Sequence, residues 1–346
     1  MFLRSVSLAR VCRKGPAAEL ATMPDQPRKP SLWKTYTLRN IRNEIILRLD
    51  ARLKRGAAPK RGRTPVGGYD DTHARNVGAF YDVNHDKFMK VYGEVIQAFR
   101  TRDINDLLDH QMKNIGFKPG QRVLDAGCGI AAPAIHFARN AHVQVDAITI
   151  STAQYTAARQ RVAAANLAQQ VTVVCGDYHQ LARHFANAKF DVVYFLESFG
   201  HSTAKTALID VCWEALKPGG ILYIKDLFRR IPPQPQHRER IDREIRKINA
   251  AYRYAVSDLN ELMDTLRGRG FILDSLKSVE LELEKFEDLA ISNEFQELTG
   301  IALIENWAEY VFPVDFFEIK CVRPEFDPDE RLDRHFLQNR YHRRAE

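Results

Sequence analysis

The chain has 346 residues, of which 45% are hydrophobic and 27% are charged, as in ordinary globular proteins. It contains no run of about 18 uncharged apolar residues, the length that a membrane-spanning helix needs, so no such helix is predicted. The net charge of +7 is uneven, because residues 1–65 hold 16 Lys and Arg against four acids, a balance of +12 that leaves −5 for the rest. The basic charge therefore belongs to an N-terminal arm, and no nucleic-acid partner is expected for the body of the protein.

The five cysteines are scattered and include no Cys-x-x-Cys pair, so neither a disulfide framework nor a zinc site is predicted. A reducing, cytoplasmic location is expected. The first 18 residues contain Arg and Ser but no acid, which resembles an organelle transit peptide. An upstream start codon or a disordered tail is the simpler interpretation.

Residues 1–68 are predicted to form a basic, partly disordered arm with one amphipathic helix. Residues 15–30 are rich in Pro, Ala and charge and are expected to be disordered. Between Leu32 and Leu53, apolar residues recur every three or four positions, which predicts the helix. Packing of this helix on its own domain is the simpler interpretation, and peripheral contact with an acidic membrane surface or a partner is the alternative.

A helical cap is predicted over residues 69–117, with helix from residue 76 to residue 117. After the turn at residues 118–120, short apolar runs alternate with stretches long enough for helices. This alternation predicts an α/β fold with a parallel sheet and helical crossovers in residues 118–325, followed by a charged tail of residues 326–346. The expected strands lie at residues 122–125, 143–150, 171–175, 191–196, 221–224, 271–284 and 310–322, with a helical insertion near residues 286–305.

The strongest local motif is Val123-Leu-Asp-Ala-Gly-Cys-Gly129, a buried strand that runs into a glycine-rich turn before a helix. Glycines at such a turn let a ligand approach the backbone closely, because no Cβ intervenes. A dinucleotide-binding fingerprint would have a third Gly where this chain has Ala132, and an acid where the second strand ends at Thr149. The motif therefore argues against a nicotinamide cofactor.

Five segments together resemble the class I S-adenosylmethionine-dependent methyltransferases, over roughly residues 77–322. They are LDAGCGIAAPA, ITISTAQ, CGDY, FDVVYFLESFGH and LKPGGILYIKD. The resemblance implies a seven-stranded Rossmann-like sheet and S-adenosylmethionine as the cofactor. The cofactor-binding residues that it implies are Asp125, Gly127, Gly129 and the backbone of Cys128 around the methionine part, Thr149 or Gln154 at the ribose, and Asp177 and Tyr178 at the adenine, with Tyr92 added from the cap.

Within that class, the chain is most similar to the sterol and terpenoid C-methyltransferases. The glycine loop runs into Pro133, an aromatic helix FYDVNHDKFMKVYGE precedes the core, and the fourth strand ends in Glu197-Ser198-x-x-His201. Two departures are Ala131-Ala132 in place of Gly-Gly and the lack of a Trp after VYG. The resemblance implies a small, lipid-like acceptor and substrate contacts from Phe80, Tyr81 and Phe88, for which plain core packing is the alternative.

The chemistry explains these residue types. Methyl transfer from a sulfonium needs a nucleophile held in line in a dry site, without a metal. If the nucleophile is an alkene carbon, the product is a carbocation, which aromatic faces stabilise and from which a base removes a proton. Glu197 follows an apolar run and is the expected base, with His201 orienting it or relaying the proton. The alternatives are that Glu197 binds a substrate hydroxyl or caps a helix, and that His201 is structural.

The predicted function is therefore C-methylation of an isoprenoid alkene. O- or N-methylation of a small natural product, with Glu197 or His201 deprotonating the heteroatom, is the alternative. An RNA methyltransferase that uses the basic arm and a non-catalytic scaffold are less favoured. Asp70-Asp71 is too weak a signal to predict the Mg²⁺ that a prenyl diphosphate acceptor would need, and no metal site is predicted. Oligomeric state is not predicted from the sequence.

Overall fold

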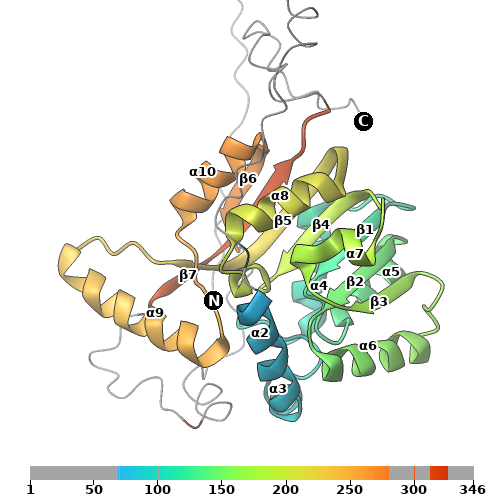
Figure 1. Cartoon of the computed structure of the whole chain (residues 1–346), viewed down its shortest axis with the longest axis horizontal. Coiled ribbons are helices and arrows are strands. Elements are labelled where there is room, and N and C mark those ends of the chain that lie inside the picture. The colour runs from blue at the N-terminus through green and yellow to red at the C-terminus, as the bar shows by residue number, and fades with distance from the viewer. Residues whose placement is uncertain (1–68, 70, 100, 280–299, 301–311, 326–346) are drawn as a thin grey trace, which may run out of the picture. The chain divides into compact units, whose positions relative to one another are not determined.

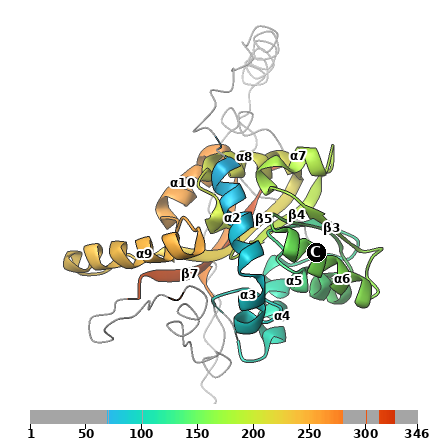
Figure 2. The same cartoon turned by 60° about the horizontal axis from the view of Figure 1, so that its bottom comes forward.

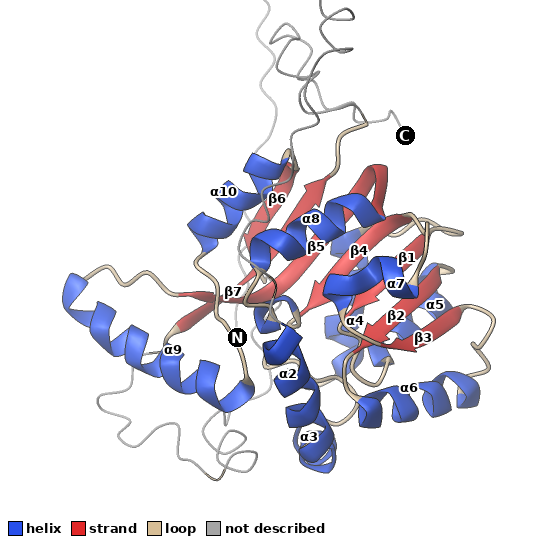
Figure 3. Ribbon diagram, viewed as in Figure 1, coloured by secondary structure: helices blue, strands red, loops and turns tan. Residues whose placement is uncertain are grey.

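The computed structural model describes residues 69, 71–99, 101–279, 300 and 312–325. The predicted N-terminal arm, the C-terminal tail and, apart from residue 300, the late helical insertion lie outside the described residues. Within them the seven strands form one sheet in the order β3-β2-β1-β4-β5-β7-β6 (Figures 1 and 3). The strands are β1 (Arg122–Ala126), β2 (Gln144–Thr149), β3 (Val171–Cys175), β4 (Phe190–Leu196), β5 (Leu216–Arg229), β6 (Ile272–Ser278) and β7 (Val314–Val322).

The first five strands are parallel, and β7 runs antiparallel to both β5 and β6. The predicted seven-stranded α/β sheet is thereby confirmed. Strand order reverses between β1 and β4, because the chain adds β2 and β3 on one side of β1 and later strands on the other. Ligands bind at such a switch point, beyond the carboxyl ends of the strands.

Two hydrophobic cores cover the two faces of the sheet, because side chains along each strand alternate between faces. One core joins the sheet to α4 (Ile104–Ile115), α5 (Ala132–Ala141) and α6 (Thr152–Ala164). The other joins it to α7 (Leu181–His184), α8 (Lys205–Ala215) and α10 (Leu259–Arg269). Figure 2 shows the two sets of helices on opposite sides of the strands. The remaining elements are η2 (Tyr178–Gln180), η3 (Phe199–His201), η4 (Pro235–His237) and α9 (Arg238–Tyr252).

The cap differs from the continuous helical region predicted over residues 76–117. It consists of α2 (Asp71–Val83), α3 (His85–Tyr92) and α4, and the described residues between α3 and α4, 93–99 and 101–103, are not helical. Gly93 ends α3 with a φ of +64°, a conformation that favours glycine. Asp103 begins α4 by accepting a hydrogen bond from the Asn105 N–H at 2.9 Å. These two residues explain the break, and the loop between them forms part of the site described below.

In the described residues, no helix is both long and apolar enough to cross a membrane.

Candidate functional site

A pocket lies beyond the carboxyl ends of β1, β2 and β4, under α2 and the loop of residues 94–97. Its empty volume, which includes the solvent at its open mouth, is about 960 Å³. The predicted site residues that line it are Tyr81, Asp125, Gly127, Cys128, Gly129, Thr149, Gln154, Asp177, Tyr178, Glu197 and His201. The pocket therefore brings together most of the residues singled out in the sequence.

The glycine turn after β1 leaves room for a ligand to approach the backbone closely. Gly127 has a φ of +97°, and a Cβ there would overlap the Cβ of Ser198, so no other residue fits. A Cβ on Gly129 would meet nothing nearer than the Ile96 side chain at 4.0 Å. Gly129 therefore leaves open space where the backbone borders the pocket.

Asp125 offers an acceptor to a ligand. The residue is 2% exposed, and its Oδ2 has no hydrogen-bond partner among the described residues. Burial raises the pKa of Asp125 to about 7, and the hydroxyl of Tyr194, its register partner on β4, opposes that rise. A buried carboxylate oxygen with only this hydroxyl near it, on a residue that lines a pocket, would suit the ammonium group of an amino-acid ligand.

The ribose and adenine candidates are held by local hydrogen bonds. Thr149 Oγ1 donates to Gln154 Oε1 at 2.8 Å, and Asp177 Oδ1 accepts from the His179 N–H at 2.8 Å. His179 also stacks on Tyr69, with ring centroids 4.5 Å apart. Both Tyr69 and His179 line the pocket, and the sequence analysis did not select either, because only the folded chain brings them together.

Three predicted residues do not line the pocket. Phe88 and Tyr92 are buried in a cluster with Phe80, and the rings of Phe88 and Tyr92 stack at 5.9 Å. The expected cofactor contact of Tyr92 and the expected substrate contacts of Phe80 and Phe88 therefore concern residues that lie outside the lining of this pocket. Helical spacing places these rings on one face of the cap, where they pack on one another and on Tyr252 at the end of α9. Tyr81 alone of the aromatic set borders the pocket.

Glu197 immediately follows β4, with its φ at +56°, in the left-handed region that non-glycine residues rarely adopt. Its side chain is 5% exposed. Oε1 pairs with the Lys225 ammonium and accepts from the Phe99 N–H at 3.1 Å, and Oε2 accepts from the Ala98 N–H. A carboxylate has about four acceptor positions, so one position on Oε2 is left for a ligand.

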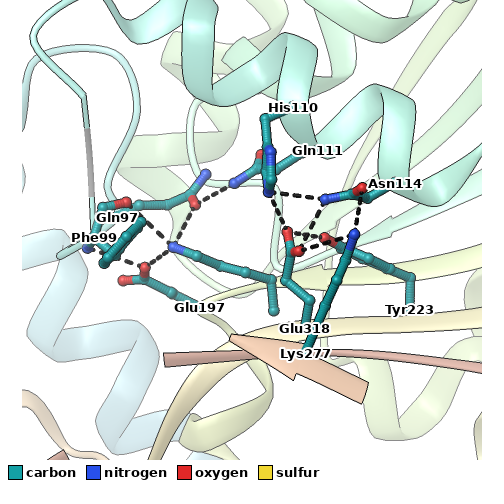
Figure 4. A network of polar contacts seen from close by, with 10 residues as sticks. Gln97, Phe99, His110, Gln111, Asn114, Glu197, Tyr223, Lys277 and Glu318 are labelled. Carbon is teal, nitrogen blue, oxygen red and sulfur yellow. Dashed lines mark hydrogen bonds and ion pairs between the residues drawn. The ribbon is translucent and has the colours of Figure 1, made fainter. Parts of the chain in front are cut away.

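Lys225, on β5, is the functional candidate that the sequence analysis missed. Its side chain is 0% exposed, and besides Glu197 its ammonium donates to Gln97 Oε1 at 3.0 Å and to the Phe99 carbonyl at 3.2 Å. Gln97 is held in turn by Gln111 of α4, at 2.7 Å (Figure 4). A single Lys within the apolar strand ILYIKDLF was the signal that could have identified it.

His201 contacts both the cap and the turn after α9. Its Nδ1 lies 3.1 Å from the Arg253 carbonyl, which can only accept, so Nδ1 carries the proton. Nε2 therefore accepts the hydrogen bond from the Tyr81 hydroxyl at 2.9 Å. Burial lowers the pKa of His201 to about 4, which keeps the ring neutral near pH 7.

Among the described residues, no group of three or more His, Cys, Asp or Glu is placed to hold a metal ion. Asp71 pairs with Arg75, and Asp70 lies outside the described residues.

Comparisons with known proteins agree with this geometry. Residues 70–249 match the family described as mycolic acid cyclopropane synthetase. The chain is 29% identical over 211 residues to 27-O-demethylrifamycin SV methyltransferase of Amycolatopsis mediterranei, an alignment that covers 59% of this chain and 76% of that enzyme. It is 36% identical over 104 residues to 24-methylenesterol C-methyltransferase 2 of Oryza sativa, an alignment that covers 30% of this chain and 28% of the rice enzyme.

A solved structure shares the fold. Geranyl diphosphate C-methyltransferase from Streptomyces coelicolor, in complex with Mg²⁺, geranyl-S-thiolodiphosphate and S-adenosylhomocysteine, superposes with a TM-score of 0.56. The identity is 13%, and the superposition covers 74% of this chain and 99% of that one. The arrangement of sheet and helices is therefore that of a Rossmann-like methyltransferase.

Proposed function

We propose that this chain, which belongs to the mycolic acid cyclopropane synthetase family of S-adenosylmethionine-dependent methyltransferases, methylates a carbon atom of a small, largely apolar acceptor. The acceptor class that we favour is an isoprenoid alkene. The observation that carries the proposal is Glu197, a buried carboxylate with one unused acceptor position, in a pocket also lined by Val77, Val95 and Ile150. Such a pocket suits an apolar acceptor on which positive charge develops.

The residues that would hold the cofactor follow from the pocket. Gly127 and Gly129 admit it to the backbone, and Asp125 would accept from its ammonium group through the unpartnered Oδ2. Thr149 and Gln154 would face the ribose, and Asp177 and Tyr178 the adenine, with Cys128 contributing its backbone. When bound, S-adenosylmethionine supplies an activated methyl group on a sulfonium centre.

The chain's own residues would then stabilise the positive charge on the acceptor and remove a proton from it. Tyr81 borders the pocket, and one face of its ring stacks on Phe88 with centroids 4.8 Å apart. The other face would stabilise a nearby cation by about 0.5 to 2 kcal/mol. Glu197 would attract the same cation and remove a proton from the carbon next to it through Oε2. That transfer leaves an alkene on the product and a neutral carboxyl group on the protein.

Methylation of oxygen or nitrogen is the second candidate, and the hydrogen bond between Tyr81 and His201 favours it. Tyr81 could take a proton from a heteroatom while passing its own to Nε2 of His201. The pKa of His201, lowered by burial to about 4, makes the ring a weak proton acceptor. We place carbon methylation first because the apolar side chains of Val77, Val95 and Ile150 at the pocket suit an isoprenoid acceptor.

Incubation of the full chain with methyl-labelled S-adenosylmethionine and a panel of isoprenoid alkenes, sterols and phenols tests the proposal. We expect label in an isoprenoid product, and we expect Glu197→Gln to lower kcat by about 10²- to 10⁴-fold while KM for the acceptor changes little. The Lys217→Met variant, which alters an exposed ion pair on the same sheet, is the control and should remain active. Label only in phenols or amines would favour the second candidate.

A further inference from the structure

We propose that Lys225 is a positioning residue, which holds the Glu197 carboxylate and the loop of residues 94–99 in one arrangement at the wall of the pocket. This inference rests on the proposed function, because it assigns Lys225 to the site at which Glu197 would act. It adds a residue that neither the sequence motifs nor the pocket lining identified.

The donors of Lys225 are fully used. An ammonium group has three N–H donors, and three acceptors surround this one: Glu197 Oε1, Gln97 Oε1 and the Phe99 carbonyl. The rings of Phe99 and Phe316 lie 5.2 and 5.5 Å from Nζ, within the range of cation–π attraction. This environment suits a charged lysine in one fixed position, even though the side chain is 0% exposed.

Lys225, Glu197 and the loop of residues 94–99 all contact one another. Lys225 binds the loop through Gln97 and Phe99, and the loop returns the Ala98 and Phe99 N–H groups to Glu197. The neighbouring loop residues Glu94, Val95, Ile96 and Gln97 line the pocket. The position of the pocket wall therefore depends on the ion pair, and Figure 4 shows Glu197, Gln97 and Phe99 close together in this network.

A mainly structural role would involve only packing, whereas this arrangement depends on charge. Removal of Lys225 alone leaves Glu197 as a buried anion without its cation. Such a change destabilises a protein more than replacement of both charged residues does. Removal of both charges leaves no buried ion. A positioning role through charge therefore predicts that the double variant Lys225→Met/Glu197→Gln holds the loop better than Lys225→Met does.

Other ionisable groups face the pair. Asp226 follows Lys225 on β5 and is 1% exposed, and burial, with a contribution from the Glu197 charge, raises the pKa of Asp226 to about 6. Tyr81 and Tyr254 also lie within the field of Glu197, and Glu318 is the register partner of Lys225 on β7. Because a change at Lys225 also alters the electrostatic field at these groups, the variants are compared with one another at a single pH.

Titration calorimetry with S-adenosylmethionine at about pH 7 tests the inference on the full chain without knowledge of the acceptor. We expect Lys225→Met to weaken cofactor binding about tenfold or more, because the loop that lines the pocket loses its contacts with the ammonium group. Lys225→Arg keeps the charge and should bind within about threefold of the unmodified chain. The double variant should recover most of the loss, and Lys217→Met should bind normally.

The outcomes separate the two proposals. If the unmodified chain binds no S-adenosylmethionine, the proposed function is overturned, and the inference with it. If that chain binds the cofactor but Lys225→Met binds equally well, or the double variant loses the sum of the two single losses, the inference alone is overturned. Failure of Lys225→Met to fold while the double variant folds supports the inference, and failure of both to fold contradicts it.

Discussion

The hydroxyl of Tyr81 on α2 donates a hydrogen bond across 2.9 Å to Nε2 of His201, 120 residues further along the chain. This contact ties the cap to the segment after β4, and it directs the hydroxyl proton of Tyr81 onto the histidine. The ring of Tyr81 remains at the pocket. Ring and hydroxyl can therefore be tested separately.

Tyr81→Phe keeps the ring and removes the hydroxyl. We expect kcat for carbon methylation to change less than about threefold, because the aromatic face is retained. The free energy of unfolding should fall by about 0.5 to 1.5 kcal/mol, because Nε2 of half-buried His201 loses its donor. Steady-state kinetics and urea unfolding measure the two effects. A loss of kcat of about 100-fold or more would instead indicate proton transfer through Tyr81 to His201.

Gly127→Ala should abolish cofactor binding. The new Cβ would overlap Ser198, and the φ of +97° is strained for any residue with a side chain. Gly268→Ala is the matched control, because a Cβ at this position in α10 meets nothing within 4 Å, and Ala in a helix should stabilise the protein by up to about 1 kcal/mol. Calorimetry with S-adenosylmethionine compares the two, and normal binding by Gly127→Ala would refute the assigned role of the turn.

Because the pKa of Asp125 is raised, we expect cofactor binding to release a proton. Burial raises the pKa of Asp125 in the folded protein to about 7, above its ordinary value. The folded state therefore binds more protons than the unfolded state below pH 7, and the contribution of this group to stability falls as pH rises from about 4 to 7. A bound ammonium group would favour the ionised form. Calorimetry at pH 6 in buffers of different ionisation enthalpy should detect release of a proton, and Asp125→Asn should eliminate it.

For His201 we expect the opposite dependence of stability on pH. Burial lowers its pKa to about 4, below its unfolded value, so the unfolded state binds more protons and stability falls as pH decreases from about 6.5 to 4. Asp125 contributes with the opposite sign over the same range, so the His201 contribution is isolated by comparing the unmodified chain with His201→Asn. Urea unfolding should show that the unmodified chain loses more stability, or gains less, than His201→Asn between about pH 7 and pH 5. A control variant at exposed His142 should behave like the unmodified chain. An unchanged pH dependence in His201→Asn would show that another group carries the loss.

Much of the fold was predictable because its signals are local. The strands at residues 122–126 and 171–175 are short apolar runs. Position 127 has no room for a side chain, and the glycine in the sequence indicates this directly. The break at residues 93–103 also had local signals, in Gly93 and the N-cap Asp103, but the aromatic periodicity around them favoured a continuous helix.

The site was less predictable, because side-chain partners come from distant segments. Helical spacing placed Tyr81 and Tyr92 in one aromatic set, yet only the packing of α2 against the sheet decides which ring borders the pocket. The contact of Lys225 with Glu197 likewise depends on the pairing of β4 with β5, where Leu196 and Lys225 are register partners. A buried lysine in an apolar strand indicates a partner, but the sequence does not name it.

The central claim is methyl transfer to carbon in the pocket that contains Glu197. The most direct measurement is NMR of the product formed by the full chain from S-adenosylmethionine with a ¹³C-labelled methyl group and an isoprenoid alkene. The account predicts a labelled methyl bonded to carbon, and no such product from Glu197→Gln in the same time. A labelled methyl bonded to oxygen or nitrogen, or full activity of Glu197→Gln, would contradict it.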